Sequence, residues 1–221
     1  MTSSKFQVAS FKCPTLPLAT CYLKLATCYL KLATCYLKLN MPFSTTSIPD
    51  LIVFEPAVFH DERGYLFESY NQNVWAEAGI HAAFVQDNQA RSTRGVLRGL
   101  HYQVGEMAQA KLVRVTEGEV LDVAVDLREG SPTLGQWYSI RLSAENKRQL
   151  FVPRGFAHGY LVLSETAEFA YKCDNFYSKA HEGGVRFDDP ILGIDWEFDL
   201  EELLVSEKDL ALPGFVGRLR K

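Results

Sequence analysis

From about residue 50 onward the chain is a series of short apolar or alternating runs, interrupted every few residues by Gly, Pro, Asn or Asp. In the clearest run, 118–127, Leu and Val at the odd positions from 121 onward alternate with Asp122, Ala124 and Asp126. A period of two residues is typical of a β-strand, because successive side chains point to opposite faces. This pattern restricts the chain to a fold made of many short strands.

Further runs with strand character lie at 111–115, 137–142, 149–152, 160–163 and 168–173. Turn-forming residues separate them, as in Glu-Gly-Ser-Pro at 129–132. Helix is expected only at the margins, at 73–78 and with mixed spacing across 199–212. We therefore expect an all-β sandwich or barrel with Greek-key or jelly-roll connections, a few short peripheral helices and a pocket at its mouth. The pattern leaves open whether the carboxylate of Asp122 faces solvent or a polar interior.

The overall charge and the length of the apolar runs each argue against one class of partner. The 221 residues carry a formal net charge of -4, whereas non-specific binding to nucleic acid needs a basic surface. The apolar runs are far shorter than the roughly 20 residues of a membrane span. We expect neither nucleic acid nor a membrane as a partner.

Residues 1–40 differ from the rest of the chain. They hold five lysines, no acidic residue and three identical copies of Leu-Ala-Thr-Cys-Tyr-Leu-Lys, at 18–24, 25–31 and 32–38. A coiled coil would need acids to pair with the lysines, and an organelle transit peptide would be rich in arginine. We expect residues 1–40 to be an extension outside the fold, with Met41 opening a single domain that covers 41–221.

Cysteine is concentrated in the same extension. Four of the five cysteines lie there, which leaves Cys173 alone in the domain. A fold without a disulfide framework suits a reducing compartment, so we expect a cytoplasmic protein.

Two histidines are the candidates for chemistry, because the chain has no glycine-rich phosphate loop, dinucleotide fingerprint or spaced cysteine cluster. His101 follows Arg98, and His158 lies in Gly-Phe-Ala-His-Gly at 155–159. A histidine near its ordinary pKa can accept a proton at neutral pH. Nearby cations, such as Arg98 and Lys111, would lower that pKa, so a carboxylate is needed to orient and compensate the ring.

A metal site is not expected. Gln103 occupies the position where a second ligand would follow His101, and two histidines without a third ligand make a weak zinc or iron site. Tyr171 is either a half-buried strand aromatic or a proton donor. Lys208 and Asp209, taken alone, read as part of a solvated charged segment.

Nine motifs occur in a recognisable order and spacing: DERG at 61–64, FESYN at 67–71, FVQDN at 84–88, VLRGLH at 96–101, KLVR at 111–114, EVLDVAVD at 119–126, SAENKRQL at 143–150, GFAHG at 155–159 and SEKD at 206–209. In these motifs the chain resembles the dTDP-4-dehydrorhamnose 3,5-epimerase family. The resemblance covers about residues 45–212 and none of the repeats.

The resemblance implies a cupin-like jelly-roll homodimer that uses no cofactor or metal. It implies inversion of C3 and C5 of dTDP-4-dehydro-6-deoxy-D-glucose, which gives dTDP-4-dehydro-L-rhamnose. In the roles it implies, His101 is the base, Asp209 orients it, Tyr171 is the acid across the sugar ring and Lys111 stabilises charge on the C4 oxygen.

The resemblance also implies a set of substrate-binding residues. Arg63 and Arg98 would hold the diphosphate, Tyr177 would stack on thymine and His158 would line the pocket. The remaining ligand contacts would be Glu68, Gln86, Asn88, Glu182 and Lys208.

Other functions remain open at this point. A single-carbon epimerase or a 3,4-ketoisomerase on a related dTDP-deoxysugar would have nearly the same motifs, although a ketoisomerase has less need of an opposite-face acid such as Tyr171. A non-catalytic sugar-binding cupin is disfavoured by the intact His101, Lys111, Tyr171 and Asp209.

Overall fold

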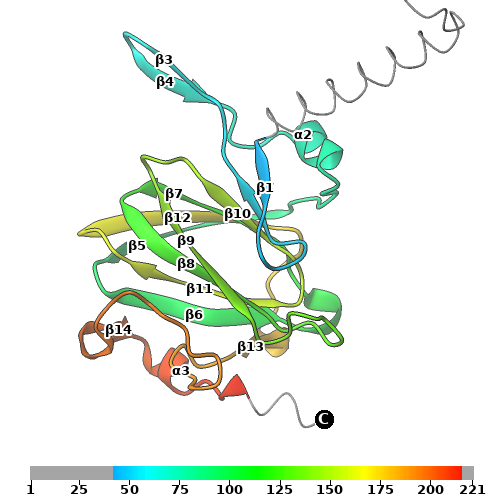
Figure 1. The fold of residues 1–221 in the computed structure, drawn as a ribbon, viewed down its shortest axis with the longest axis vertical. Helices are drawn as coiled ribbons and strands as arrows, with labels where there is room; N and C mark the ends of the chain where they lie inside the picture. The colour runs from blue at the N-terminus through cyan, green and yellow to red at the C-terminus, as the bar shows by residue number, and fades with distance from the viewer. Residues whose placement is uncertain (1–41, 216–221) are drawn as a thin grey trace, which may run out of the picture. The chain divides into compact units, whose positions relative to one another are not determined.

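Two sheets face each other in residues 42–215, the part of the chain that this computed structural model describes (Figure 1). In order across the first sheet, its strands are β1 (Phe43–Thr45), β2 (Ile52–Phe54), β10 (Gln149–Val152), β7 (Lys111–Glu117), β12 (Thr166–Cys173) and β5 (Gln86–Thr93). The second sheet contains β13 (Glu182–Gly184), β6 (Val96–Gln103), β11 (Phe156–Val162), β8 (Glu119–Asp126) and β9 (Trp137–Ser143), with β14 (Leu204–Val205) parallel to β6. The expected extension, 1–40, lies outside the described residues.

The core between the sheets is built from alternate residues of both. Val113 of β7 and Phe169 of β12 pack in one buried cluster with Ala124 of β8 and Phe156 of β11. A second cluster covers the opposite face of β8, where Trp196 and other residues of the C-terminal segment pack on it. The predicted all-β fold is confirmed, and its architecture is that of a cupin-like jelly-roll barrel.

Strand β8 is buried on both faces, which settles the open question about its carboxylates. Asp122 and Asp126 each have 0% of their surface exposed. Asp122 shares its face with Ala124, which belongs to the core between the sheets. The strand therefore turns Asp122 toward the barrel interior and not toward solvent.

The expected helices are short. Helix α2 (Gln72–Glu77) begins at Asn71, whose side chain accepts a hydrogen bond from the amide of Asn73. The mixed spacing at 199–212 does not form one helix. It divides into a 3-10 turn (Leu200–Glu202), strand β14 and helix α3 (Glu207–Leu210), because Ser206 caps α3 immediately after the strand. Further 3-10 turns lie at Gly105–Met107 and Lys179–His181. In the described part, no helix is long and apolar enough to cross a membrane.

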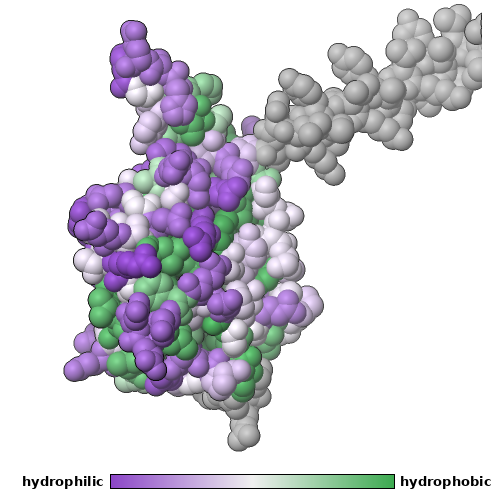
Figure 2. All heavy atoms as spheres, turned by 60° about the vertical axis from the view of Figure 1, so that its left-hand side comes forward, coloured by the Kyte–Doolittle hydropathy of each residue, from purple (hydrophilic) through white to green (hydrophobic). Residues whose placement is uncertain are grey.

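A separate hairpin, β3 (Val58–Asp61) and β4 (Gly64–Phe67), extends away from the barrel (Figure 1). Its strands pair only with each other. Phe59 and Leu66 are 68% and 74% exposed. Figure 2 shows apolar surface on the hairpin below a hydrophilic tip. The cation of Lys147 lies 4.2 Å from the ring centroid of Tyr65, so the hairpin contacts the β9–β10 connection.

Asp126 closes the loop after β8 and gives a test of the fold. Its carboxylate accepts hydrogen bonds from Arg128 Nη2 at 2.9 Å, Ser131 Oγ at 2.6 Å and Thr133 Oγ1 at 2.7 Å. Burial opposes ionisation, but these donors outweigh it and hold the pKa of Asp126 well below its ordinary value of 3.8. The ionised Asp126 therefore contributes to the free energy of unfolding. This contribution is complete above the pKa of the group in the unfolded state, and it is lost as pH falls through the pKa in the folded state.

We predict that Asp126→Asn lowers the free energy of unfolding by about 1–3 kcal/mol at pH 7, because an amide cannot satisfy the same donors. The difference from wild type should shrink below about pH 4. Urea unfolding between about pH 3 and pH 7 measures both effects. The control is Asp50→Asn, because Asp50 binds the same Arg128 but is 70% exposed, so it should cost less than about 1 kcal/mol. A difference that persists unchanged into acid would contradict the assignment.

Candidate active site

His101 projects from β6 and is oriented by a carboxylate from a distant part of the chain. Its Nε2 lies 2.8 Å from Oδ1 of Asp209, which is 4% exposed. Asp209 lies in α3, where its amide donates to the capping Ser206 Oγ at 3.1 Å. The Asp209 Oδ2 accepts from the amide of Gly99 at 3.4 Å. The C-terminal segment thus places one buried carboxylate against the imidazole.

A glycine is required beside His101. Gly99 has φ +142°, and a Cβ there would lie 2.6 Å from the Cα of Gly159 on the neighbouring strand β11. The two strands approach closely at this point, and their register shifts between His158 and Tyr160. Glycine permits both the backbone conformation and the close approach.

The electrostatic surroundings of His101 favour its neutral form. Burial lowers the pKa of His101 from its ordinary value of 6.5, and the charges of Lys111 and Lys208 lower it further, whereas Asp209 opposes them. With Nε2 directed at the carboxylate, Nδ1 is the nitrogen left for the cavity. The geometry provides a neutral imidazole that can accept a proton.

Lys111 and Tyr171 come from the opposite sheet. They lie on the adjacent strands β7 and β12, and the Lys111 Nζ is 5.9 Å from the centroid of the Tyr171 ring. Burial raises the pKa of Tyr171, so its phenol stays protonated at neutral pH. Burial lowers the pKa of Lys111, with Cys173 and Asp122 opposing the change.

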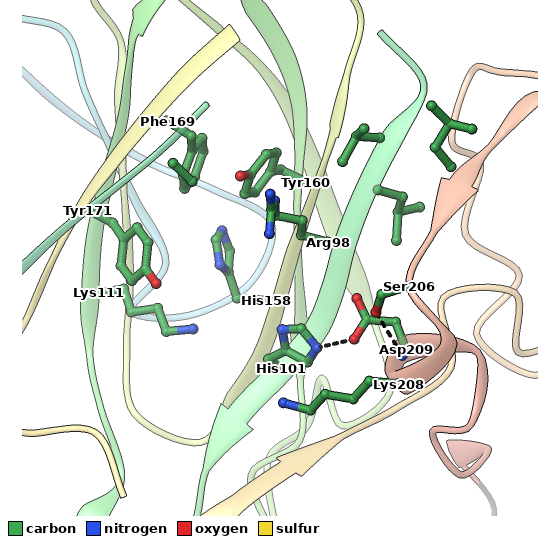
Figure 3. A pocket seen from close by; sticks show the side chains of 14 residues that line it. Arg98, His101, Lys111, His158, Tyr160, Phe169, Tyr171, Ser206, Lys208 and Asp209 are labelled. Atoms are coloured by element: carbon green, nitrogen blue, oxygen red, sulfur yellow. Dashed lines mark hydrogen bonds and ion pairs between the residues drawn. The ribbon is translucent and has the colours of Figure 1, made fainter. Parts of the chain in front are cut away.

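These groups line one cavity of about 420 Å³ between the sheets (Figure 3). His101 approaches it from β6, whereas Tyr171 and Lys111 approach from the other side. A ring held between them would have an imidazole and a phenol on different faces. The arrangement can therefore remove a proton from one face of a bound molecule and supply one to the other.

His158 reaches the same cavity as part of a second histidine–carboxylate pair. Its Nε2 lies 2.9 and 3.1 Å from the two oxygens of Asp122. His158 is 6% exposed and Asp122 is fully buried. Asp122 thus fixes the orientation of the His158 imidazole, which lines the cavity.

An adjacent lobe of about 330 Å³ shares His101, Lys111 and Tyr171 with the main cavity. Glu182 organises its rim, because it accepts hydrogen bonds from Lys208 Nζ at 2.5 Å and from Tyr177 Oη at 3.0 Å. The predicted site residues on its wall are Gln86, Asn88, Tyr177 and Glu182. Tyr177 is 52% exposed, so its ring is free to stack on a planar group.

Arg98 lines the main cavity, where its Nε donates to Ser92 Oγ at 3.1 Å. Lys208 and Asp209 also line the main cavity. Their local sequence alone predicts a solvated charged segment. Sequence reasoning missed Tyr160 and Ser206, which are further wall residues. Tyr160 could have been found, because it lies two residues after His158 and shares its strand face.

Two predicted site residues lie apart from these lobes. Arg63 is at the tip of the β3–β4 hairpin, where it pairs with Asp61 and has an 84% exposed side chain. Glu68 follows β4 and accepts from Asn71 Nδ2 at 3.1 Å. Neither residue lines the two lobes that contain His101.

In residues 42–215, no group of three or more His, Cys, Asp or Glu side chains has the proximity that a metal site needs. The two histidines of the cavity are each directed at one carboxylate.

Comparison with known proteins agrees with the geometry. Residues 45–216 match the family model described as dTDP-4-dehydrorhamnose 3,5-epimerase. The Pseudomonas aeruginosa dTDP-4-dehydrorhamnose 3,5-epimerase is 59% identical over 170 residues, which are 76% of this chain and 93% of the relative.

Two solved structures extend the comparison. The Elizabethkingia anophelis dTDP-4-dehydrorhamnose 3,5-epimerase is 55% identical, with a TM-score of 0.77 over 79% of this chain and 96% of that one. A Legionella pneumophila dTDP-6-deoxy-D-glucose-3,5-epimerase, in complex with dTDP-4-keto-L-rhamnose, is 50% identical with a TM-score of 0.75, and the match covers 78% of this chain and 91% of that one. With the matched motifs and a fold shared over most of both chains, this chain belongs to the dTDP-4-dehydrorhamnose 3,5-epimerase family.

Proposed function

We propose that this chain converts dTDP-4-dehydro-6-deoxy-D-glucose to dTDP-4-dehydro-L-rhamnose by inverting C3 and C5. The observation that carries the proposal is the placement of a neutral imidazole and a protonated phenol on opposite sheets of one cavity, with an ammonium group beside the phenol. Family membership supports the same substrate.

The reaction begins with removal of a proton next to the C4 ketone. The Nδ1 lone pair of His101 takes the proton from carbon, and the C–H electron pair moves into the enolate. Lys111 stabilises the negative C4 oxygen, an electrostatic effect that often dominates enzymatic acceleration. Asp209 acts as a positioning residue, because it orients the imidazole and stabilises the imidazolium that forms.

Inversion follows when the proton returns from the other face. Tyr171 transfers its phenolic proton to carbon, and the enolate electrons reform the ketone. The phenolate regains a proton from solvent and the His101 imidazolium releases its proton to solvent, so both groups return to their starting states. The same sequence at the second carbon completes the product. No cofactor or metal is required by this scheme, because each step only moves a proton.

The two lobes suit the rest of the substrate. Arg98 presents a planar guanidinium that can hold two oxygens of the diphosphate. Tyr177 would stack on thymine, with Glu182, Lys208, Gln86 and Asn88 as polar contacts at that end. His158, fixed by Asp122, would contact the sugar.

We predict that, in deuterated water, the wild-type protein places deuterium at both C3 and C5. Tyr171→Phe should form inverted product about 10²- to 10⁴-fold more slowly, because a positioned acid contributes that much. It should still exchange protons on the face of His101, whereas His101→Ala should lose exchange at both carbons. Nuclear magnetic resonance of the sugar measures the label at each carbon.

The control for His101→Ala is His81→Ala, since His81 is exposed outside both lobes and should keep wild-type exchange. Label at only one carbon would support the single-carbon epimerase. Binding without any exchange would support a non-catalytic cupin.

We also predict that the acidic limb of the kcat/KM profile has its midpoint below pH 6.5. The base must be neutral, and burial together with Lys111 and Lys208 lowers the pKa of His101, so activity is lost only as pH falls through that lowered value. Lys208→Gln removes one of the cations and should move the midpoint to higher pH. Initial rates at subsaturating substrate measure the shift, and a midpoint that moves to lower pH would contradict the assignment.

We further propose that the protein is a cytoplasmic homodimer in which the β3–β4 hairpin completes the site of the other subunit. Support comes from the exposed Phe59 and Leu66 on the hairpin and from the position of Arg63 apart from its own cavity. An exposed apolar surface that serves no core is typical of an interface. Cys173, the one cysteine of the described residues, is a free thiol, as suits a reducing compartment.

Complementation tests this dimer. We predict that Arg63→Ala and His101→Ala, each nearly inactive alone, regain about one quarter of wild-type activity when they are co-expressed, because half of the random dimers then contain one complete site. The matched control pairs His101→Ala with Asp209→Asn, whose defects fall in the same cavity, and it should recover nothing. Activity of the purified dimers measures the result, and no recovery in the first pair would contradict a shared site.

A further inference from the structure

The Tyr160 side chain has a buried hydroxyl that the fold does not use. Tyr160 lies on β11, is 5% exposed and lines the main cavity. Its ring stacks on Phe169 with the centroids 4.0 Å apart and the planes 13° apart. Among the described residues, its hydroxyl and the indole nitrogen of Trp75 are the buried side-chain polar atoms without a hydrogen-bond partner.

Such a group destabilises the free protein, because a buried hydroxyl without a partner has lost its water and gained nothing. The Trp75 nitrogen lies in a separate cluster around α2, whereas the Tyr160 hydroxyl points into the cavity, between Phe169 and Arg98 (Figure 3). The free protein therefore keeps the Tyr160 hydroxyl in the cavity although it lowers stability. A hydrogen-bond partner that arrives with the ligand explains this.

The neighbours of Tyr160 restrict where that partner lies on the ligand. Arg98 is opposite Tyr160 in the pairing of β11 with β6. The Ser92 hydroxyl beside them already accepts a hydrogen bond from Arg98 Nε. Phe169 separates Tyr160 from the proton donor Tyr171, and its ring centroid is 6.0 Å from that of Tyr171. The partner should therefore be close to the group bound by Arg98 and away from the reacting carbons.

The proposed substrate has one hydroxyl that meets these conditions, and this step rests on the proposed function. C1 carries the diphosphate, C3 and C5 react, C4 is the ketone and C6 is a methyl group. The C2 hydroxyl is thus the hydroxyl on a non-reacting carbon, next to the diphosphate-bearing C1. We propose that Tyr160 is a specificity-determining residue whose hydroxyl forms a hydrogen bond with the C2 hydroxyl of the hexose.

The chemistry of the phenol favours a hydroxyl over a phosphate as its partner. Burial raises the pKa of Tyr160, and the charge of Arg98 and the nearby Ser92 hydroxyl oppose the rise. The contact with Ser92 falls short of hydrogen-bond geometry, so the phenol stays neutral and can both donate and accept. A phosphate would have to enter a fully buried spot without its water, whereas Arg98 is exposed and can hold it at the opening.

The test compares dTDP-4-dehydro-6-deoxyglucose with its 2-deoxy analogue on the full chain and on Tyr160→Phe. Wild type should prefer the 2-hydroxylated sugar by roughly tenfold or more in kcat/KM, the effect of leaving a polar group of the site unpaired. Tyr160→Phe should lose that preference, with KM for the parent sugar raised about tenfold and kcat nearly unchanged. Its rate on the 2-deoxy analogue should equal that of wild type.

Two controls keep the result interpretable. Tyr138→Phe removes the hydroxyl of a partly buried barrel tyrosine that does not line the cavity, and it should keep the preference of wild type. The melting temperature of Tyr160→Phe should equal or exceed that of wild type, because a hydroxyl without a partner is removed.

Preference for the 2-hydroxylated sugar that persists in an active Tyr160→Phe protein would overturn the role of Tyr160 and leave the proposed function intact. A clearly lower melting temperature of this variant would also overturn it, because the hydroxyl would then have a structural partner. If wild type turned over neither sugar, the proposed function would fail instead. Dissociation constants of the two sugars, measured by calorimetry on both proteins, would then decide the role of Tyr160. The wild type should bind the 2-hydroxylated sugar more tightly than the 2-deoxy analogue, and Tyr160→Phe should not.

Discussion

The structure depends on one constraint: the space between the two sheets has to serve both as hydrophobic core and as a container for ionisable groups. Valine, alanine and phenylalanine fill part of it, and two histidine–carboxylate pairs together with a lysine occupy the rest. A buried charge without a partner is costly. The barrel meets this requirement by setting Asp209 against His101 and Asp122 against His158, so the same contacts that satisfy burial also orient two imidazoles that line the cavity.

The placement of His101 on one sheet and of Lys111 and Tyr171 on the other follows from the same constraint. The β6 strand presents His101, and the strands β7 and β12 present Lys111 and Tyr171 from the other side. A base and an acid on one strand would address the same face of a sugar ring. On opposite sheets they address different faces, which is the geometric condition for inversion. Burial then tunes them in useful directions, because it lowers the pKa of the imidazole and raises that of the phenol.

Much of the fold was predictable because it depends on local patterns. Alternating and apolar runs located β7 to β12, which are six of the twelve strands that residues 42–215 contribute to the two sheets, since a strand between a core and another layer has to alternate or be apolar throughout. In the segment 199–212, charged and apolar residues mimic a helix, although the chain there forms a 3-10 turn, a short strand and a short helix. The same segment supplies Asp209, so the weakest part of the prediction concerned an element that positions the site.

By itself, the sequence determined the β architecture and the family and supplied candidates for the groups that exchange protons, because strand periodicity and motif spacing are properties of the chain. It left undecided which side of β8 holds its carboxylates, and the fold placed Asp122 inside against His158. Tertiary structure also decided that Arg63 lies apart from its own cavity and that the hydroxyl of Tyr160 lies inside it without a partner. These are relations between residues far apart in the chain, and only packing brings such residues together.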